Sequence, residues 1–142
     1  MTITRYATAS DADVIVDLLP QLLDDERNIA QPAQWRETLL SLLDRARGAI
    51  LVAEHEGEIT GIITVSYNVA LRFGGEYAQI EELIVDSKGR GRGTGALLVN
   101  AAIAEARQRG CMEIGLYARE HNVPFYEKLG FVYTGPEMRQ SL

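Results

Sequence analysis

Asp86-Ser87-Lys88-Gly89-Arg90-Gly91-Arg92-Gly93-Thr94-Gly95 is the stretch that decides the fold. It joins a strand-like run ending at Val85 to a helical pattern that begins near Gly93. Alternate glycines let backbone N–H groups approach a ligand without a Cβ in the way, and a helix start adds unpaired amides and a positive dipole end. Arg90 and Arg92 supply guanidinium groups that match phosphate oxygens. The junction therefore predicts a site for a phosphate-bearing ligand.

The same glycines also fit the dinucleotide fingerprint G-x-G-x-x-G/A, read from Gly91 to Ala96. A dinucleotide fold places this turn after its first strand and needs several further βα units, whereas fewer than about fifty residues follow Ala96. The phosphate-loop pattern of ATPases fails, because no Lys-Ser or Lys-Thr pair follows the last glycine. Space argues against a dinucleotide fold, and nucleotide binding at the loop remains a testable alternative.

Hydrophobic periodicity predicts strands and helices on both sides of this junction. The first helix is expected to start with a capping-box-like pair, Ser10 and Asp13. The expected strands are 3–6, 49–53, 59–65, 77–85, 112–117 and 131–133, and the expected helices run from 10 to about 23, from 32 to about 47, from 93 to 110 and over 124–129. The order is β-α-α-β-β-β-α-β-α-β, with room for one more short strand near Met138.

This order predicts an α/β domain built on a mixed sheet. The three successive strands between 49 and 85 indicate an antiparallel meander, and the strand–helix–strand unit that follows implies a parallel crossover. A chain of 142 residues is the usual size of one domain, and we expect residues 1–142 to form a single unit.

Composition excludes several classes of function. The net charge of −6 argues against general nucleic-acid binding and favours a cationic small molecule or peptide as partner. No apolar run is long enough to span a bilayer and no signal-peptide pattern is seen at the N-terminus, so we expect a cytoplasmic protein. The single cysteine, Cys111, cannot form an internal disulfide or a cysteine metal motif. No metal is expected.

Two motifs, in the correct order, carry a resemblance to a known family. Arg90-Gly91-Arg92-Gly93-Thr94-Gly95 follows a strand that ends in valine, and Phe125-Tyr126-Glu127-Lys128-Leu129-Gly130-Phe131 lies further along the chain. With Ile80-Glu81-Glu82-Leu83-Ile84-Val85 upstream, they resemble the Q/R-x-x-G-x-G/A signature and the second motif of the GNAT superfamily of N-acetyltransferases. The resemblance implies a GNAT-like three-layer fold over the whole chain.

The resemblance also implies the cofactor. The co-substrate would be acetyl-CoA, with its pyrophosphate held by the loop amides from Arg90 to Gly95. The pantetheine arm would run along Leu83-Ile84-Val85 like an added strand, bonded to backbone groups of Leu83 and Val85. Many family members have an asparagine seven residues before the second motif's tyrosine, but this chain has Arg119 there and Asn122 nearer. Asn122 is therefore a weaker candidate for a pantetheine contact.

Acetyl transfer to an amine requires two proton transfers. A lysine-like amine is protonated at neutral pH, so a base must take a proton before attack. Glu81 and Glu82 are the candidates, and in a regular strand they would point to opposite faces. A bulge, common in this strand of the family, could change which face each carboxylate takes. We favour Glu81 as base through a water; alternatively, both carboxylates only attract a cationic substrate.

The second transfer protonates the departing CoA thiolate. By the resemblance, Tyr126 occupies the position of the family's tyrosine acid; the competing interpretation is a core tyrosine.

Two classes of function follow. The first is acetyl transfer to a primary amine of a small molecule or peptide, by direct attack in a ternary complex. The second is a non-catalytic acyl-CoA-binding sensor or partner-binding module. Exposed sheet edges are compatible with a homodimer.

Overall fold

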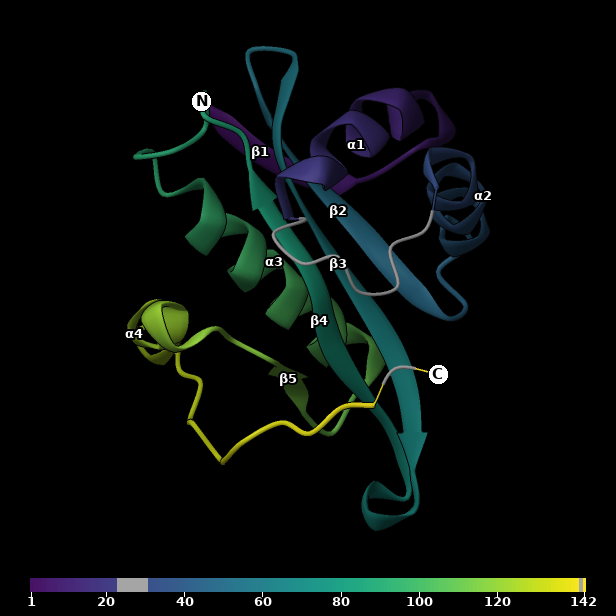
Figure 1. The fold of residues 1–142 in the computed structure, drawn as a ribbon, viewed down its shortest axis with the longest axis vertical. Helices are drawn as coiled ribbons and strands as arrows, with labels where there is room; N and C mark the ends of the chain where they lie inside the picture. The colour runs from purple at the N-terminus through teal and green to yellow at the C-terminus, as the bar shows by residue number, and fades with distance from the viewer. Residues whose placement is uncertain (23–30, 141) are drawn as a thin grey trace.

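The computed structural model describes residues 1–22, 31–140 and 142, and a five-stranded sheet forms its centre (Figure 1). Its strands are β1 (Thr2–Tyr6), β2 (Gly48–His55), β3 (Glu58–Ala70), β4 (Gly75–Val85) and β5 (Ile114–Leu116), and they lie in this order across the sheet. Strands β1 to β4 pair antiparallel, and β5 pairs parallel with β4. The predicted meander and the predicted parallel crossover are both confirmed.

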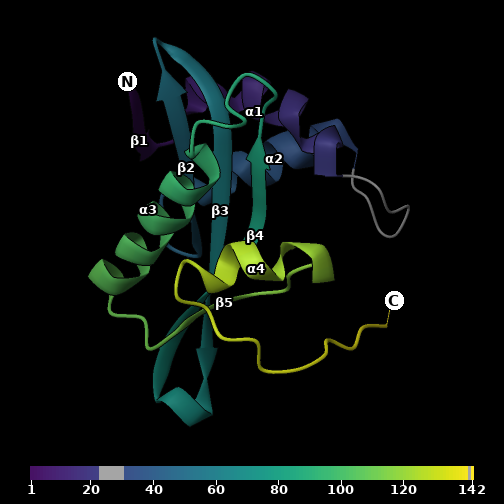
Figure 2. The ribbon, with the colours of Figure 1, turned by 90° about the vertical axis from the view of Figure 1, so that its left-hand side faces the viewer.

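Helices cover both faces of the sheet (Figure 2). One face carries α1 (Ala12–Leu18) and α2 (Pro32–Leu42), and the other carries α3 (Thr94–Arg109) and the short α4 (Val123–Glu127). The 3₁₀ turns are η1 (Ala9–Asp11), η2 (Leu19–Leu22), η3 (Leu71–Phe73) and η4 (Glu120–Asn122). The predicted α/β class on a mixed sheet is therefore correct. Within the described ranges, every helix is too short or too polar to traverse a bilayer.

Each face of the sheet has its own hydrophobic core. On the α3 face, Ile63 and Val65 of β3 pack with Leu98 and Val99 of α3. On the α1 face, Ile62 of β3 packs with residues of α1 and α2, among them Ile15, Leu18 and Leu39. Because side chains alternate along β3, one strand contributes to both cores.

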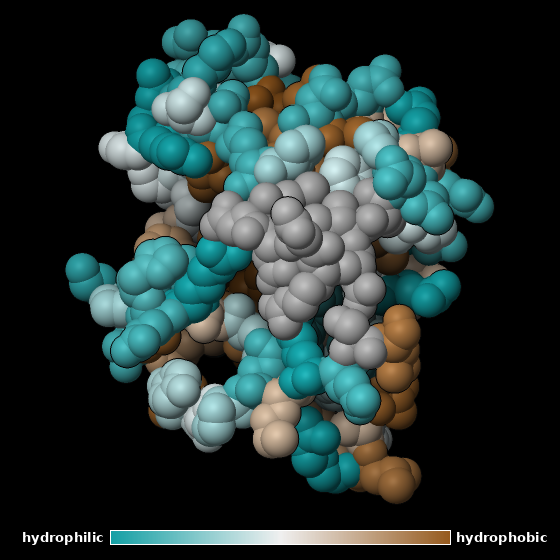
Figure 3. Space-filling model, viewed as in Figure 1, coloured by the Kyte–Doolittle hydropathy of each residue, from teal (hydrophilic) through white to brown (hydrophobic). Residues whose placement is uncertain are grey.

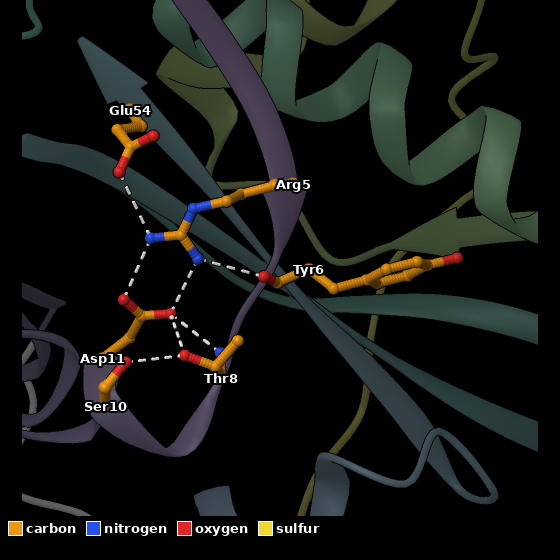
Figure 4. A network of polar contacts seen from close by, with 6 residues as sticks. All are labelled: Arg5, Tyr6, Thr8, Ser10, Asp11 and Glu54. Atoms are coloured by element: carbon orange, nitrogen blue, oxygen red, sulfur yellow. Dashed lines mark hydrogen bonds and ion pairs between the residues drawn. The ribbon is translucent and has the colours of Figure 1, made fainter. Parts of the chain in front are cut away.

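Figure 4 shows the polar corner that joins β1 to α1. The Arg5 guanidinium donates to both carboxylate oxygens of Asp11, at 2.8 and 3.0 Å, and reaches Glu54 on β2 at 3.4 Å. Asp11 also accepts the backbone N–H of Thr8 at 2.8 Å. These hydrogen bonds lower the pKa of the Asp11 carboxyl, with the bond from Arg5 as the main cause. The corner is thereby fixed from three elements.

The capping pair predicted at Ser10 and Asp13 is wrong. The box forms two residues earlier, between Thr8 and Asp11, and Asp13 instead forms an ion pair with Arg36 of α2. The first helix is also shorter than expected, because Pro20 has no backbone N–H to donate and the chain tightens into η2. Leu23, where the helix was expected to end, lies outside the described residues.

The predicted final strand at 131–133 is not formed, and no strand occurs near Met138 in the described residues. Phe131 packs against the α3-face core, but Val132 and Tyr133 are 80% and 64% exposed. Gly130 and Gly135 take φ angles of 96° and 134°, which turn the chain on both sides of the segment. The neighbouring strand β5 spans only three residues, so it offers a short edge for pairing.

The β3–β4 hairpin extends beyond the helices at the lower end of Figure 1. Apolar residues gather at this tip in Figure 3, where Val69 and Leu71 are 79% and 102% exposed. Neither residue belongs to the two cores. These two apolar side chains therefore project from the sheet, beside the exposed Arg72, and take no part in its packing.

Candidate active site

The sheet splits between β4 and β5. The two strands pair only at Ala78–Ile114, Gln79–Gly115 and Ile80–Leu116, whereas β4 continues to Val85 (Figure 1). Beyond Ile80, the edge of β4 that faces away from β3 has no strand partner among the described residues. An extended ligand could pair with this open edge as an added strand would.

The backbone pattern shows which groups face the open edge. The N–H of Asp86 donates to the carbonyl of Thr60 on β3, at 2.8 Å. Because successive residues of a strand direct their backbone groups to alternate sides, Ile84 also faces β3, while Leu83 and Val85 face the opening. Of the three residues predicted to lie along the cofactor arm, two therefore offer main-chain donors and acceptors to it.

The glycine-rich loop lies directly after this edge. Its first turn is closed by Gly89 and Arg90, whose N–H groups both donate to the carbonyl of Asp86 at 2.8 and 3.2 Å. Gly91 and Gly93 take φ angles of 78° and 74°, which favour glycine. Within the described chain, the amides of 91–96 have no backbone acceptor, and they lead into and form the first turn of α3, a helix of 16 residues. This arrangement suits an anion such as a pyrophosphate.

Packing requires glycine at position 89 and brings Gly95 close to α4. A Cβ on Gly89 would lie 2.9 Å from the carbonyl oxygen of Thr60, so only glycine fits against β3 there. A Cβ on Gly95 would lie 3.4 Å from the ring of Phe125 on α4. The hydroxyl of Thr94 is buried and donates to the carbonyl of Gly89 at 3.0 Å. The loop is thus held from β3, α3 and α4.

The two arginines of the loop are exposed. Arg90 folds back, and its Nε donates to the carbonyl of Val85 at 3.2 Å. Arg92 is exposed between the two positive-φ glycines. Both cations lie on the loop whose amides are free, so they add positive charge where an anion would bind.

A β-bulge in β4 changes the expected arrangement of the two carboxylates. Thr64 pairs with Glu82 and Val65 pairs with Ile80, so Glu81 is the extra residue. Ile80 and Leu83 both pack toward the α3-face core, and consequently Glu81 and Glu82 lie together on the α1 face. The regular-strand expectation of opposite faces is wrong, and the bulge left open by the sequence is present.

The two carboxylates have different surroundings. Glu81 is exposed and accepts a hydrogen bond from the Ser66 hydroxyl at 2.6 Å. Glu82 is half-buried and accepts a hydrogen bond from the hydroxyl of Thr64. Burial raises the pKa of Glu82, the Thr64 hydrogen bond lowers it, and the nearby charge of Glu81 raises it, with a net increase. A carboxylate with a raised pKa is a better base near neutral pH than an ordinary glutamate.

Tyr126 lies on the other side of the sheet. Its ring packs against the α3-face core, in edge contact with Phe125 and Phe131 at centroid distances of 4.9 and 5.8 Å. Burial raises the pKa of its phenol, so the group keeps its proton at neutral pH. In the described part of the chain, its hydroxyl makes no hydrogen bond. Tyr126 therefore has a proton available for a ligand atom.

Asn122 ends η4 and is exposed immediately before α4. It thus immediately precedes the helix that carries Tyr126. A separate hollow of about 520 Å³ adjoins Tyr126 and is lined by α3, β5, α4 and residues 129–137. None of the residues 81–95 lines it, so it is distinct from the split and its loop.

Three site residues were not predicted. Thr64 and Ser66 of β3 hold the two carboxylates, and Phe125 packs against the first turn of α3. Only the β3–β4 register brings Thr64 and Ser66 to Glu82 and Glu81, and nothing in the local sequence states that register. Phe125 could have been noticed, because it belongs to the second motif.

Comparisons with known proteins agree with this geometry. A sequence model of the acetyltransferase (GNAT) family matches residues 15–131. Glucosamine 6-phosphate N-acetyltransferase of Trypanosoma brucei brucei is 33% identical, with 97% of this chain and 94% of that protein covered.

Solved structures give the same result. An acetyltransferase of Trypanosoma brucei superposes with a TM-score of 0.82 at 28% identity, covering all of both chains. Glucosamine-6-phosphate N-acetyltransferase of Arabidopsis thaliana superposes with a TM-score of 0.83 at 25% identity, covering 99% of this chain and 97% of that one. The chain therefore belongs to the GNAT family and is an acetyl-CoA-dependent acetyltransferase.

Proposed function

We propose that the chain transfers the acetyl group of acetyl-CoA to the primary amine of a small molecule, by direct attack in a ternary complex. The observation that carries the proposal is the split between β4 and β5, with the glycine loop at its end. The cofactor's pyrophosphate lies on the free amides of Gly91 to Gly95, beside the Arg90 side chain, and its pantetheine arm pairs with Leu83 and Val85. No covalent enzyme intermediate is needed.

The proton transfers use groups on opposite faces of the sheet. Glu82 takes the proton of the incoming ammonium on the α1 face, either directly or through a water. The amine nitrogen then attacks the thioester carbonyl, and an N–H at the open edge of β4 stabilises the oxyanion, a kind of contact that contributes about 3 kcal/mol in other enzymes. As the C–S bond breaks, Tyr126 gives its proton to the CoA thiolate on the α3 face. The nitrogen loses its second proton to water to give the neutral amide, and solvent returns a proton to the phenolate of Tyr126. We assign the base to Glu82 rather than Glu81, because its surroundings raise its pKa.

Cys111 has no part in this route. It follows the C-terminal end of α3, whereas the glycine loop precedes the N-terminal end, and a helix of 16 residues is about 24 Å long. Burial also raises the pKa of the Cys111 thiol, which disfavours the reactive thiolate. These features support direct attack over a thiol relay.

Glucosamine 6-phosphate is the first acceptor to test, because similar proteins carry its name. Its ammonium group would meet Glu81 and Glu82, the acidic pair on the α1 face. That pair would equally suit a polyamine or a peptide amine. The sequence also has an acidic run, Asp24-Asp25-Glu26, that would suit a cationic acceptor, but it lies outside the described residues.

The decisive experiment mixes the protein with acetyl-CoA and separate amines: glucosamine 6-phosphate, glucosamine, spermidine and a lysine peptide. Thiol release and product mass are read together. We expect thiol release matched by a product 42 Da heavier, about the mass that an acetyl group adds, with at least one amine. Tight binding of acetyl-CoA without turnover of any amine would favour the sensor alternative. Preference for NAD or ATP over acetyl-CoA in calorimetry would contradict the proposal.

We propose further that residues 1–142 act as one catalytic unit, because both cores share the same sheet. Self-association through β5 is compatible with this unit, since the outer edge of β5 is unpaired among the described residues and Tyr117 beside it is 58% exposed. Sedimentation at several concentrations measures that association. A constant monomer mass would rule out the homodimer.

A further inference from the structure

We propose that Thr64 is a positioning residue for acetyl transfer: its hydroxyl holds the backbone and the carboxylate of Glu82 together inside the β4 bulge. The inference rests on the proposed function, in which Glu82 is the base. Thr64 lies on β3, in a segment without any motif, and its role follows from the register alone.

Two hydrogen bonds meet at one oxygen. Thr64 Oγ1 accepts the backbone N–H of Glu82 at 3.1 Å, and it donates its own hydrogen to the Glu82 carboxylate. A hydroxyl has one hydrogen and lone pairs, so it can perform both tasks at once. Thr64 itself is only 6% exposed, so water cannot easily replace it.

The bulge creates the need for such a group. An extra residue in one strand disrupts the local ladder and changes the direction of the side chains. Here the extra residue is Glu81, and the next N–H is the one that Thr64 Oγ1 accepts. The same hydroxyl therefore supports the bulge through one hydrogen bond and sets the direction of the Glu82 carboxylate through the other. A valine at position 64 would have nearly the same shape but neither hydrogen bond.

The charges around Glu82 are few. Glu81 precedes it on the same strand and the same face, and its charge raises the pKa of Glu82. The turn η2, which packs against β4, consists of Leu19, Pro20, Gln21 and Leu22 and carries no charge. From β3, Thr64 and Ser66 face the carboxylate pair, and neither is ionisable at neutral pH. Helix α3 packs on the opposite face. Among the described residues, the Thr64 hydroxyl is thus the group that stabilises the ionised form of Glu82.

The first test needs no substrate. The pKa of Glu82 is measured by ¹³C NMR titration of its carboxyl carbon in the free protein, in wild type, Thr64→Val, Thr64→Ser and Thr4→Val. Thr4 is an exposed threonine on β1 and serves as the matched control. We expect Thr64→Val to raise the pKa of Glu82 by about one unit, because the ionised form loses its donor. Thr64→Ser and Thr4→Val should retain the wild-type value.

The second test is the pH profile of kcat/KM, with the first amine of the panel that the wild type acetylates. The base must be ionised, so its acidic limb should move to higher pH in Thr64→Val by about the same one unit, while the KM for acetyl-CoA stays unchanged. Thr64→Ser should restore the wild-type profile. A residue that only supported the fold would change stability without moving this limb.

The outcomes separate the two proposals. An unchanged pKa of Glu82 in Thr64→Val overturns the positioning role, whatever the enzyme does. A shifted pKa with an unmoved limb, in an active enzyme, shows that Glu82 is not the base and overturns the role as well. A wild type that turns over no amine contradicts the proposed function. If Thr64→Val does not fold, Thr64→Ala and Thr64→Ser provide the same comparison.

Discussion

At the scale of single residues, Glu82 combines a half-buried position with the proposed role of base. Burial disfavours its ionised form and raises its pKa above that of an unfolded glutamate. The linkage between protonation and folding has a definite sign here. The contribution of Glu82 to stability is fully present at pH values below the pKa that it has in the unfolded chain. It is lost as the pH rises through the higher pKa that it has in the folded protein. When the Glu82 carboxyl is ionised, it thus lowers the stability of the fold.

Replacing Glu82 by glutamine tests whether the ionised carboxylate lowers the stability of the fold. Glutamine cannot ionise, so Glu82→Gln should unfold at a higher temperature than wild type at pH 8 and at a similar temperature at pH 4. The same variant should lose acetyl transfer by about 10²- to 10⁴-fold, the usual range for a removed acid or base. Thermal unfolding at both pH values and steady-state kinetics measure the two effects. If the variant and the wild type unfolded at the same temperature at both pH values, ionisation of Glu82 would not destabilise the fold.

Tyr126 can be separated from its packing by removing one oxygen. Tyr126→Phe keeps the ring contacts with Phe125 and Phe131 and removes the proton donor. We expect kcat to fall by about 10²- to 10⁴-fold, with little change in the affinity for acetyl-CoA measured by calorimetry. Because its pKa is raised, the wild-type phenol should stay protonated up to a higher pH than an ordinary tyrosine. Wild-type turnover in Tyr126→Phe would remove the residue from the role of acid.

At the scale of elements, the glycine loop depends on a close approach to β3. The Cβ of an alanine at position 89 would lie 2.9 Å from a backbone oxygen of Thr60, so the backbone itself must move. Gly89→Ala should cost about 1–3 kcal/mol in the free energy of unfolding and weaken acetyl-CoA binding. Gly75→Ala is the control, because a Cβ there meets no atom within 4 Å. Chemical denaturation and calorimetry measure both, and equal results for the two variants would contradict a packed loop.

The elements also show what could be predicted from the sequence. The order of elements along the chain, the parallel crossover and the loop follow from local periodicity and glycine spacing. The sequence pair Glu56-Gly57 is a turn signal between two β-rich runs, and the structure forms a turn there with φ angles of 51° and 82°. The bulge at Glu81 could not be read, because an extra residue in β4 is defined only against β3. The strand expected at 131–133 has β-prone residues, but pairing needs a partner edge and β5 is short. Local propensity therefore predicted most elements, whereas the bulge and the missing final strand depend on pairing between distant segments of the chain.

At the scale of the whole molecule, the sheet separates the proposed acid from the two candidate bases. Tyr126 packs on the α3 face, and Glu81 and Glu82 lie on the α1 face. The split between β4 and β5 is the opening in the sheet that connects its two faces. In the proposed reaction, the acceptor amine would meet Glu82 on the α1 face, and the departing thiolate would meet Tyr126 on the α3 face. The relative placement of these faces therefore depends on the sheet staying intact as one body.

Cooperative unfolding tests that dependence. Ile15 belongs to the α1-face core and Ile63 to the α3-face core, at 1% and 0% exposure, so they form a matched pair. Ile15→Val and Ile63→Val should each lower the free energy of unfolding by about 1 kcal/mol. Each should shift the Trp35 fluorescence and the far-ultraviolet circular dichroism together, because β3 contributes to both cores. If Ile63→Val shifted the dichroism but left the fluorescence of Trp35 on α2 unmoved, the two layers would unfold separately and the single-unit proposal would fail.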